Sequence, residues 1–296
     1  MNEVNLINNI VSTLSSSLIG DDCAYLSDLE IVVTQDNLIE NIHFKRDWYT
    51  PYQLGYKAAA VNISDILASG AKPKYLTLGV SLPKSINEEF FTEFIKGFND
   101  ASYSAVLCGG DITGSSQDII ISVTAIGSTK RRKISSRKNA KMGYVVVVSG
   151  EHGASSAGLK ELLNNSDCKE HIISHLMPIL DAEFSETISK NINVDYAMMD
   201  TSDGLGDALF KIAEASGVKI EVDYSLIPHR KELSYNDVVL GGEDYKLVAA
   251  VPVEFAQKYN MTVIGNVVSY DGIRLNISGK CYKSYNELKI YKHFEE

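Results

Sequence analysis

The sequence lacks the segments that would place a protein in a membrane or outside the cell. No apolar run approaches the roughly 20 residues that a bilayer-spanning helix needs. The N-terminal stretch has no basic region ahead of an apolar run, so no signal peptide is predicted. The four cysteines are too far apart to form a CxxC pair. We therefore expect reduced thiols and a cytoplasmic protein.

Positive charge is also scarce. The formal net charge is −10, from 28 Lys and Arg against 38 Asp and Glu. This balance argues against a nucleic-acid partner and against an anionic membrane surface. An acidic protein can still bind an anionic substrate, provided that metal cations intervene.

The familiar phosphate-binding motifs are absent as well. The segment "GASSAGLK" (153–160) superficially resembles a P-loop, but it lacks the adjacent Gly-Lys-Ser/Thr. There is no GxGxxG after the first predicted strand, and no set of protein-kinase motifs. Any bound phosphate must then be held by metal ions and a few basic residues.

Helical and strand patterns interleave along the chain and predict an α/β or α+β protein of two domains. A helix is predicted from its N-cap, Thr50, to about Ser69, and a second is predicted to open with a capping box from Ser85 to Glu88. Further helices are predicted over 154–165 and 205–216. Strands are predicted over 30–36, 75–82, 105–111, 118–128, 144–150, 194–200, 218–224 and 245–252.

A basic stretch over 129–141 connects the two halves. We expect an N-terminal domain over 1–136 and a C-terminal domain over 137–296.

Acidic residues recur at the ends of these elements, beside glycine or hydroxyl residues. They are Asp21, Asp22, Asp36, Asp65, Asp111, Asp200, Asp203, Glu243 and Asp244. Any one of them alone is usually solvated. Asp65, however, lies within the apolar pattern of its helix, where a buried carboxylate needs a partner. Clustered carboxylates repel one another unless cations neutralise them, and Mg²⁺ shared with substrate phosphates does so. The pattern indicates nucleotide-phosphate chemistry through Mg²⁺.

A series of motifs in fixed order extends this interpretation. They are "IGDDCAYL", "TQDNLIENIHF", "YKAAAVNISDILASGAKPKYLTLGVSLP", "CGGDIT", "SGEHGASSAGL", "DTSDGL" and "GGEDYKL". Together they resemble the thiamine-monophosphate kinases, a family in the superfamily of aminoimidazole-ribonucleotide synthetase. The resemblance covers nearly the whole chain. It implies an N-terminal α/β domain whose mixed sheet pairs across a homodimer, and a C-terminal α/β domain that covers it.

The resemblance also implies an activity, which is ATP-dependent phosphorylation of thiamine monophosphate to thiamine diphosphate. Transfer would be direct and in line, with several Mg²⁺ ions and no catalytic residue beyond the metal ligands. By motif position, the implied metal contacts are Asp22, Thr34, Asp36, Asp65, Asp111, Asp200 and Asp203. The implied ATP contacts are Gly110, Asp111, Arg137 and Ser202. The implied substrate contacts are His43, Glu243 and Tyr291.

Some positions depart from the family pattern. Gln35 stands where the family usually has threonine or serine, which leaves one metal contact open. The segment "SHLMPILDAEF" (174–184) replaces a stretch that is richer in arginine and proline in relatives. Asp207 comes one residue earlier than the usual aspartate, a rotation of about 100° around a helix, so we predict a solvated helix surface there. Asp21 is predicted to be either a turn residue beside Asp22 or a residue that supports the metal contacts without touching the metal.

Two alternative functions stay open. The chain could be another ATP-using enzyme of the superfamily. Selenophosphate synthetase, however, would need a reactive cysteine with a partnering lysine, and Cys23 is predicted to be a small buried residue. The hydrogenase maturation protein would end in a cysteine motif, whereas this sequence ends "HFEE". The other alternative is a non-catalytic nucleotide- or thiamine-binding protein, for which Gln35 is the best support.

Overall fold

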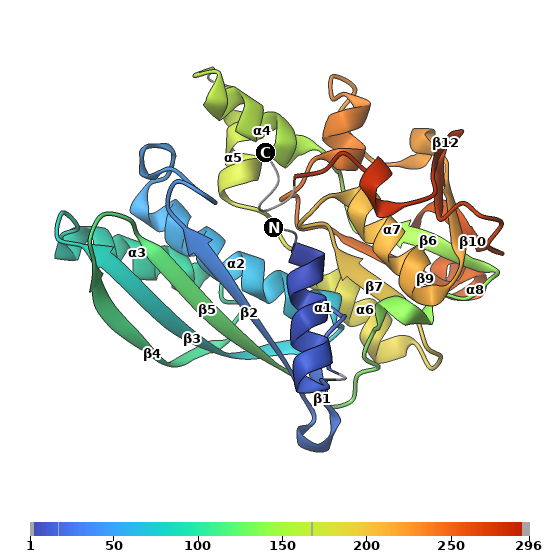
Figure 1. Cartoon of the computed structure of the whole chain (residues 1–296), viewed down its shortest axis with the longest axis horizontal. Helices are drawn as coiled ribbons and strands as arrows, with labels where there is room; N and C mark the ends of the chain where they lie inside the picture. Colours follow the sequence, from blue (N-terminus) through green and yellow to red (C-terminus); the bar gives the residue numbers. More distant parts are fainter. Residues whose placement is uncertain (1–2, 17, 167, 292–296) are drawn as a thin grey trace.

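The computed structural model describes residues 3–16, 18–166 and 168–291, and arranges them around two sheets (Figure 1). The first sheet is mixed and has the strand order β1-β2-β5-β3-β4, in which only β3 and β4 pair in parallel. Its strands are β1 (Ala24–Leu26), β2 (Ile31–Ile39), β3 (Lys72–Pro83), β4 (Val106–Ser115) and β5 (Ile120–Ser128).

The second sheet curls through the rest of the chain in the order β12-β11-β8-β10-β6-β9-β7. Its strands are β6 (Tyr144–Val148), β7 (Ala197–Asp200), β8 (Lys219–Val222), β9 (Leu247–Pro252), β10 (Thr262–Val268), β11 (Leu275–Ile277) and β12 (Lys280–Tyr282). The two-part α/β architecture that the sequence predicts is confirmed.

Eight α-helices accompany the sheets in the described ranges. They are α1 (Glu3–Leu14), α2 (Pro51–Ala68), α3 (Glu88–Asp100), α4 (Ala154–Leu163), α5 (Lys169–Leu176), α6 (Ala182–Asn191), α7 (Leu205–Ser216) and α8 (Val253–Lys258). The sequence analysis did not predict α1, α5, α6 or α8. Within these ranges, no helix combines the length and apolar character needed to cross a membrane.

Helix α2 lies at the centre of the molecule, between the first sheet and the second part of the chain (Figure 1). It begins as predicted. The Thr50 side chain accepts a hydrogen bond from the Gln53 backbone, and the Gln53 side chain accepts one from the Thr50 backbone. Most of the helix is buried, including three polar side chains that an exposed helix would leave in water, Lys57, Asn62 and Ser64.

The predicted start of α3 is wrong. The helix begins at Glu88, and its N-cap is Asn87, whose Oδ1 accepts from the Phe90 backbone N–H at 2.8 Å. Because Asn87 supplies that acceptor, Ser85 is not needed as a cap. The Ser85 hydroxyl instead accepts a hydrogen bond from Arg46.

Strand β2 continues three residues beyond its predicted end at Asp36. Asp36 is therefore an internal strand residue, and the alternation of side chains decides which way it faces. Thr34 and Asp36 face α2, while Gln35 faces the opposite side of the sheet.

Helices α2 and α3 cross at two glycines. A Cβ added to Gly55 would lie 1.9 Å from the Phe94 carbonyl oxygen, and one added to Gly97 would lie 1.8 Å from the Tyr52 carbonyl oxygen. The two backbones therefore touch directly, and no side chain fits between them.

We expect Gly55→Ala to destabilise the protein by more than about 2 kcal/mol, because backbone atoms cannot move aside for the new methyl group. Helix propensity alone predicts the opposite sign, a gain of up to about 1 kcal/mol. The free energies of unfolding of wild type and Gly55→Ala, measured in denaturant, decide between these two predictions. Gly114→Ala serves as the control, since a Cβ there would meet nothing within 4 Å. A stabilised Gly55→Ala variant would show that the helices can separate at little cost.

Candidate functional site

Three carboxylates that are far apart in the sequence meet between the two parts of the chain. Asp22 precedes β1, Asp65 lies on α2, and Asp200 ends β7. One ligand oxygen from each lies within 4.8 Å of the others. The Ser64 hydroxyl donates to Asp200 at 2.6 Å, and the Thr34 hydroxyl donates to Asp65 at 2.6 Å. Hydroxyl donors from α2 and β2 thus fix two of the three side chains.

The cluster is electrostatically costly without a counter-ion. Burial raises the pKa of Asp65 well above its usual range, and the neighbouring charges of Asp36 and Asp200 raise it further. Burial, helped by the charge of Asp22, raises the pKa of Asp200 to about 7. Burial, with the charges of Asp203 and Asp22, raises the pKa of Asp36 to about 6. Converging hard oxygen ligands of this kind fit a divalent cation such as Mg²⁺.

Gln35, which departs from the family pattern, lies away from this cluster. Its side chain donates to the Ser122 hydroxyl at 3.3 Å and accepts from the Thr124 hydroxyl at 3.1 Å, both on the outer face of the first sheet. On the inner face, the Asp36 backbone N–H donates to Asn62 of α2 at 3.0 Å. The Gln35 side chain is therefore not aimed at the carboxylates.

Arg137, in a 3₁₀ turn between the two sheets, reaches the cluster from the second part. Its Nη2 donates to Asp22 at 2.6 Å, and its buried Nε has no hydrogen-bond partner among the described residues. A buried guanidinium donor left over in this way suits a phosphate oxygen. Asp21 holds the same turn, accepting from the Ser136 hydroxyl and the Arg137 backbone, as its predicted turn role requires.

Two turns of the second part are hydrogen-bonded to each other beside Asp200. The Ser202 hydroxyl donates to Asp200 at 2.9 Å, and the Glu243 backbone N–H donates to the Ser202 carbonyl at 2.6 Å. A Cβ on Gly242 would lie 2.6 Å from that same carbonyl, so only glycine allows the approach. Asp203 is more exposed, and it pairs with Lys211 at 3.1 Å.

The prediction that Asp207 lies on a solvated surface is wrong. Its side chain is 1% exposed, accepts from the Tyr285 hydroxyl at 2.6 Å and pairs with Lys211 at 2.8 Å. Tyr285 approaches from the far end of the chain and covers the first turns of α7, where its ring packs on Phe210. Lys211 therefore bridges Asp207 and Asp203, beside the cluster.

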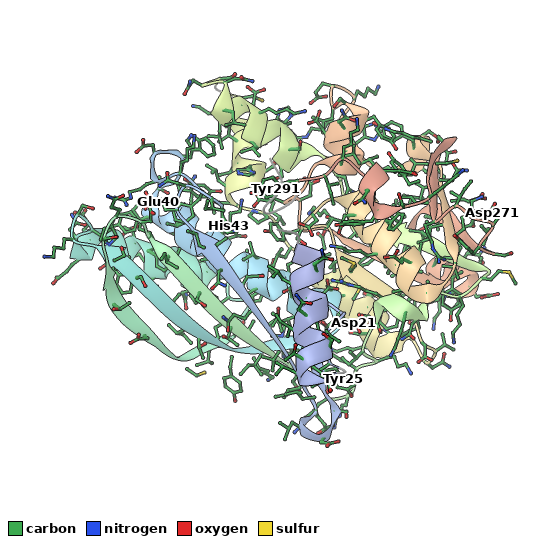
Figure 2. The ribbon with its side chains drawn as sticks, viewed as in Figure 1. Asp21, Tyr25, Glu40, His43, Asp271 and Tyr291 are labelled. Carbon is green, nitrogen blue, oxygen red and sulfur yellow. The ribbon has the colours of Figure 1, made fainter. Side chains whose placement is uncertain are left out.

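Glu243, a predicted substrate contact, meets α2 at Lys57, about two turns along the same face from Ser64, which contacts Asp200. Its Oε2 accepts from Lys57 at 3.0 Å and lies 3.2 Å from His175 Nδ1. Burial raises the pKa of Glu243, but the charge of Lys57, with smaller contributions from His175 and His43, lowers it below its usual value. Figure 2 shows His43 and Tyr291 in the middle of the view, between the two sheets. Tyr291 is largely exposed.

Gly110 and Asp111 are not brought to the cluster within this chain. Asp111 pairs with Gly79 on β3, which pairs with Ser122 on β5, which pairs with Asn37 on β2. This row lies on the outer face, and at about 4.8 Å per strand Asp111 lies roughly 14 Å from β2. Their assignment to metal and ATP stays a prediction.

Three polar residues of this site were missed by the sequence analysis. They are Lys57, Ser64 and His175. For Lys57 and Ser64 the signal was available, because both interrupt the apolar pattern of α2 as Asp65 does. His175 lies in a segment whose helix was not predicted.

The P-loop-like segment binds a carboxylate of this chain. Asp244 accepts from the Gly153 backbone N–H at 2.6 Å and the Ser155 backbone N–H at 2.9 Å, at the start of α4. Those amides are therefore already used, which agrees with the exclusion of a P-loop.

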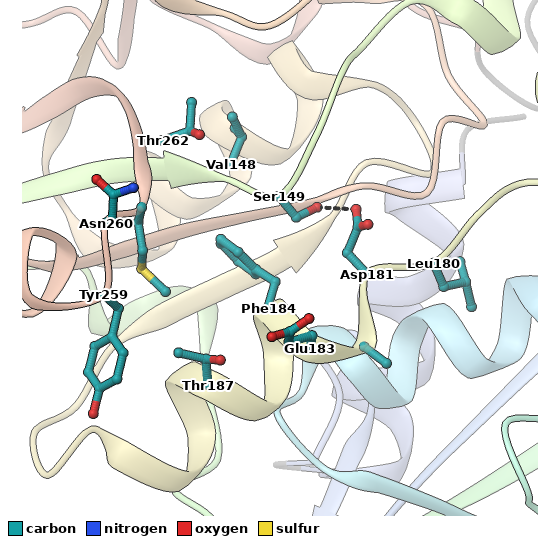
Figure 3. Close-up of a pocket in the computed structure, with 12 residues that line it drawn as sticks. Val148, Ser149, Leu180, Asp181, Glu183, Phe184, Thr187, Tyr259, Asn260 and Thr262 are labelled. Atoms are coloured by element: carbon teal, nitrogen blue, oxygen red, sulfur yellow. Dashed lines mark hydrogen bonds between the residues drawn. The ribbon is translucent and has the colours of Figure 1, made fainter.

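A hollow of about 510 Å³ lies elsewhere, beside α6 and the ends of β6 and β10 (Figure 3). Ser149 donates to Asp181 on its wall, and Phe184 and Tyr259 contribute rings. None of the predicted site residues lines it.

Comparisons with known proteins agree with this geometry. The family description "AIR synthase related protein, N-terminal domain" matches residues 20–129, and "AIR synthase related protein, C-terminal domain" matches residues 141–277. Thiamine-monophosphate kinase of Aquifex aeolicus (strain VF5) is 36% identical, over 99% of this chain and 98% of that protein. The enzyme of Bacillus subtilis (strain 168) is 34% identical, over 86% and 85%.

A solved structure described as "AaThiL complexed with AMPPCP and TMP" superposes with a TM-score of 0.88 at 33% identity, covering 99% of this chain and 97% of that one. The two-sheet fold and its carboxylate cluster thus define a protein of the AIR synthase-related superfamily. Within that superfamily, the chain belongs to the thiamine-monophosphate kinase family.

We expect Mg²⁺ to raise the melting temperature of the protein, because a bound cation removes the repulsion among Asp22, Asp65 and Asp200. The Asp65→Asn variant should behave differently. Without Mg²⁺ its melting temperature should be higher than that of wild type, since one charge is gone and the amide oxygen can still accept from Thr34. Its gain on adding Mg²⁺ should be much smaller.

The control is Asp47→Asn, at an exposed position, which should leave the Mg²⁺ response unchanged. An equal Mg²⁺-induced rise in wild type and Asp65→Asn would contradict a cation site at the cluster.

Proposed function

We propose that this chain phosphorylates thiamine monophosphate, with ATP as donor and thiamine diphosphate and ADP as products. One observation carries the proposal. Carboxylates from both parts converge beside the Nε of Arg137, which has no partner in the described residues, while Glu243 lies about two turns farther along α2. Membership of the thiamine-monophosphate kinase family supports it, as does the relative described with AMPPCP and TMP bound.

The nucleotide would be held at the carboxylate cluster. Mg²⁺ bound there would neutralise phosphate charge on both substrates and favour in-line transfer. Arg137 would donate its free Nε to a phosphate oxygen while Nη2 stays on Asp22. Ser202, fixed by its bond to Asp200, would present its backbone to the nucleotide. Thr34, Asp36 and Asp203 complete the proposed metal contacts around Asp22, Asp65 and Asp200.

The acceptor would be held on the Glu243 side, with His43 and Tyr291. A phosphate oxygen of thiamine monophosphate forms a new bond to the γ-phosphorus, and the bond from that phosphorus to the β–γ bridging oxygen of ATP breaks. The electron pair of the broken bond stays on ADP. The acceptor phosphate is largely ionised near neutral pH. No strong general base is therefore required, and positioning does most of the work.

We further propose a homodimer, with a domain boundary between residues 136 and 137. Strand β4 is an edge strand and is exposed along nearly all of its length, including Val106, Leu107 and Ile112. A long apolar edge of this kind needs a cover. A second copy would supply it, and Gly110 and Asp111 would then lie at the interface.

The activity is tested directly with purified protein, ATP, Mg²⁺ and thiamine monophosphate, by following thiamine diphosphate and ADP. We expect both products in equal amounts, and none from unphosphorylated thiamine. Binding of both substrates without product would favour a non-catalytic binding protein and overturn the proposal. Product from aminoimidazole-ribonucleotide precursors or selenide instead would favour another enzyme of the superfamily.

We expect Asp111→Asn to abolish turnover while the fold survives. If Asp111 acts across the dimer, mixing Asp111→Asn chains with inactive Asp200→Asn chains should restore activity. One site of each mixed dimer then carries both intact aspartates. Mixed dimers without activity would place Asp111 in the site of its own chain, and an active Asp111→Asn homodimer would remove it from the site.

A further inference from the structure

Lys57 is a buried cation that joins the two parts of the chain. Its side chain is 2% exposed. The ammonium donates to the Tyr49 hydroxyl at 3.1 Å, the His175 carbonyl at 2.8 Å and Glu243 Oε2 at 3.0 Å. An ammonium has three N–H donors, so all of them are used. Lys57 therefore has no donor left for a ligand, and its effect must pass through the groups it contacts.

Glu243 is held from two directions. Its backbone lies in the left-handed region, at φ 65°, which is costly for a residue other than glycine, and its N–H is bound to the Ser202 carbonyl. Its side chain is 30% exposed, and both described polar contacts fall on the same oxygen, Oε2. Oε1 is thus the oxygen left to meet a ligand.

His175 supports the same arrangement. Burial, with the charge of Lys57, lowers the pKa of His175 to about 3, so the ring is neutral near pH 7. Its Nδ1 lies 3.2 Å from Glu243 Oε2, on the same side of the carboxylate as the Lys57 ammonium. The Ser155 hydroxyl, 3.0 Å from the same nitrogen, keeps the ring in place.

From these contacts we propose that Lys57 is a positioning residue that aims the free oxygen of Glu243 at the acceptor substrate. This inference rests on the proposed function. With Oε2 tied to the ammonium, the carboxylate cannot rotate, and Oε1 presents a fixed acceptor. The thiamine moiety of the acceptor suits such an oxygen, because the amino group of its pyrimidine ring can donate a hydrogen bond and the positive charge of its thiazolium ring is attracted to the carboxylate. Lys57, buried on α2, thereby affects how tightly the acceptor binds without contacting it.

The test is Lys57→Met, with kcat, the KM for thiamine monophosphate, the KM for ATP and the melting temperature measured separately. We expect the KM for thiamine monophosphate to rise roughly ten- to hundredfold, as for a lost charged hydrogen bond. The KM for ATP should change less than about twofold, because Lys57 contacts none of the three cluster carboxylates. A similar rise in both KM values would show that Lys57 only ties the two parts together.

Because Lys57→Met leaves a carboxylate without its partner, the double variant Lys57→Met/Glu243→Gln is needed as well. We expect its KM for thiamine monophosphate to equal that of Glu243→Gln alone. Lys57 acts only by orienting the Glu243 carboxylate, so its loss has no further effect once that carboxylate is gone. Independent, additive effects would overturn the proposal.

The matched control is Arg132→Met. Arg132 is another buried cation between the parts, donating to the Gly70 carbonyl and the Ser189 hydroxyl, away from the site. This variant should melt lower and keep both KM values. A wild-type protein that makes no thiamine diphosphate would refute the proposed function itself, whereas the Lys57 inference fails only if the wild type is active and the KM split is missing.

Discussion

The structure depends on the need to satisfy polar groups inside a buried helix. Helix α2 is enclosed by the first sheet, by α3 and by the second part of the chain, yet it carries Lys57, Asn62, Ser64 and Asp65. Asn62 and Asp65 have their partners on β2, at the Asp36 backbone and Thr34, whereas Lys57 and Ser64 have theirs in the second part, at Glu243 and Asp200. Because a buried polar group without a partner costs about 1–3 kcal/mol, the two parts are held in one relative placement. The site forms where that requirement is met.

The sequence was sufficient where the pattern was local. The limits of α7 and the N-cap of α2 at Thr50 were predicted correctly, because each depends on residues within a turn of one another. The carboxylates that converge were also found, since their glycine and hydroxyl neighbours set them apart.

The rest depended on contacts between distant residues. Asp207 is covered by Tyr285, 78 residues later, and Lys57 meets Glu243 across 186 residues. The face that Asp111 occupies follows from a register shift between Leu76 and Thr77 in the pairing of β3 with β4, and a shift of one residue reverses every side chain beyond it. No composition or periodicity in the sequence reports such a shift.

The crossing of α2 and α3 at Gly55 and Gly97 has a mechanical consequence. Two helices in backbone contact have no soft layer of side chains in which to slide, so they move with the first sheet as one rigid block. The second part packs against this block through a shared apolar core that includes Leu180, Ile188 and Met198, as well as through the polar contacts of Lys57, Ser64 and Arg137. Thr34 and Asp65 both belong to the block, so their mutual placement does not depend on how the second part is packed.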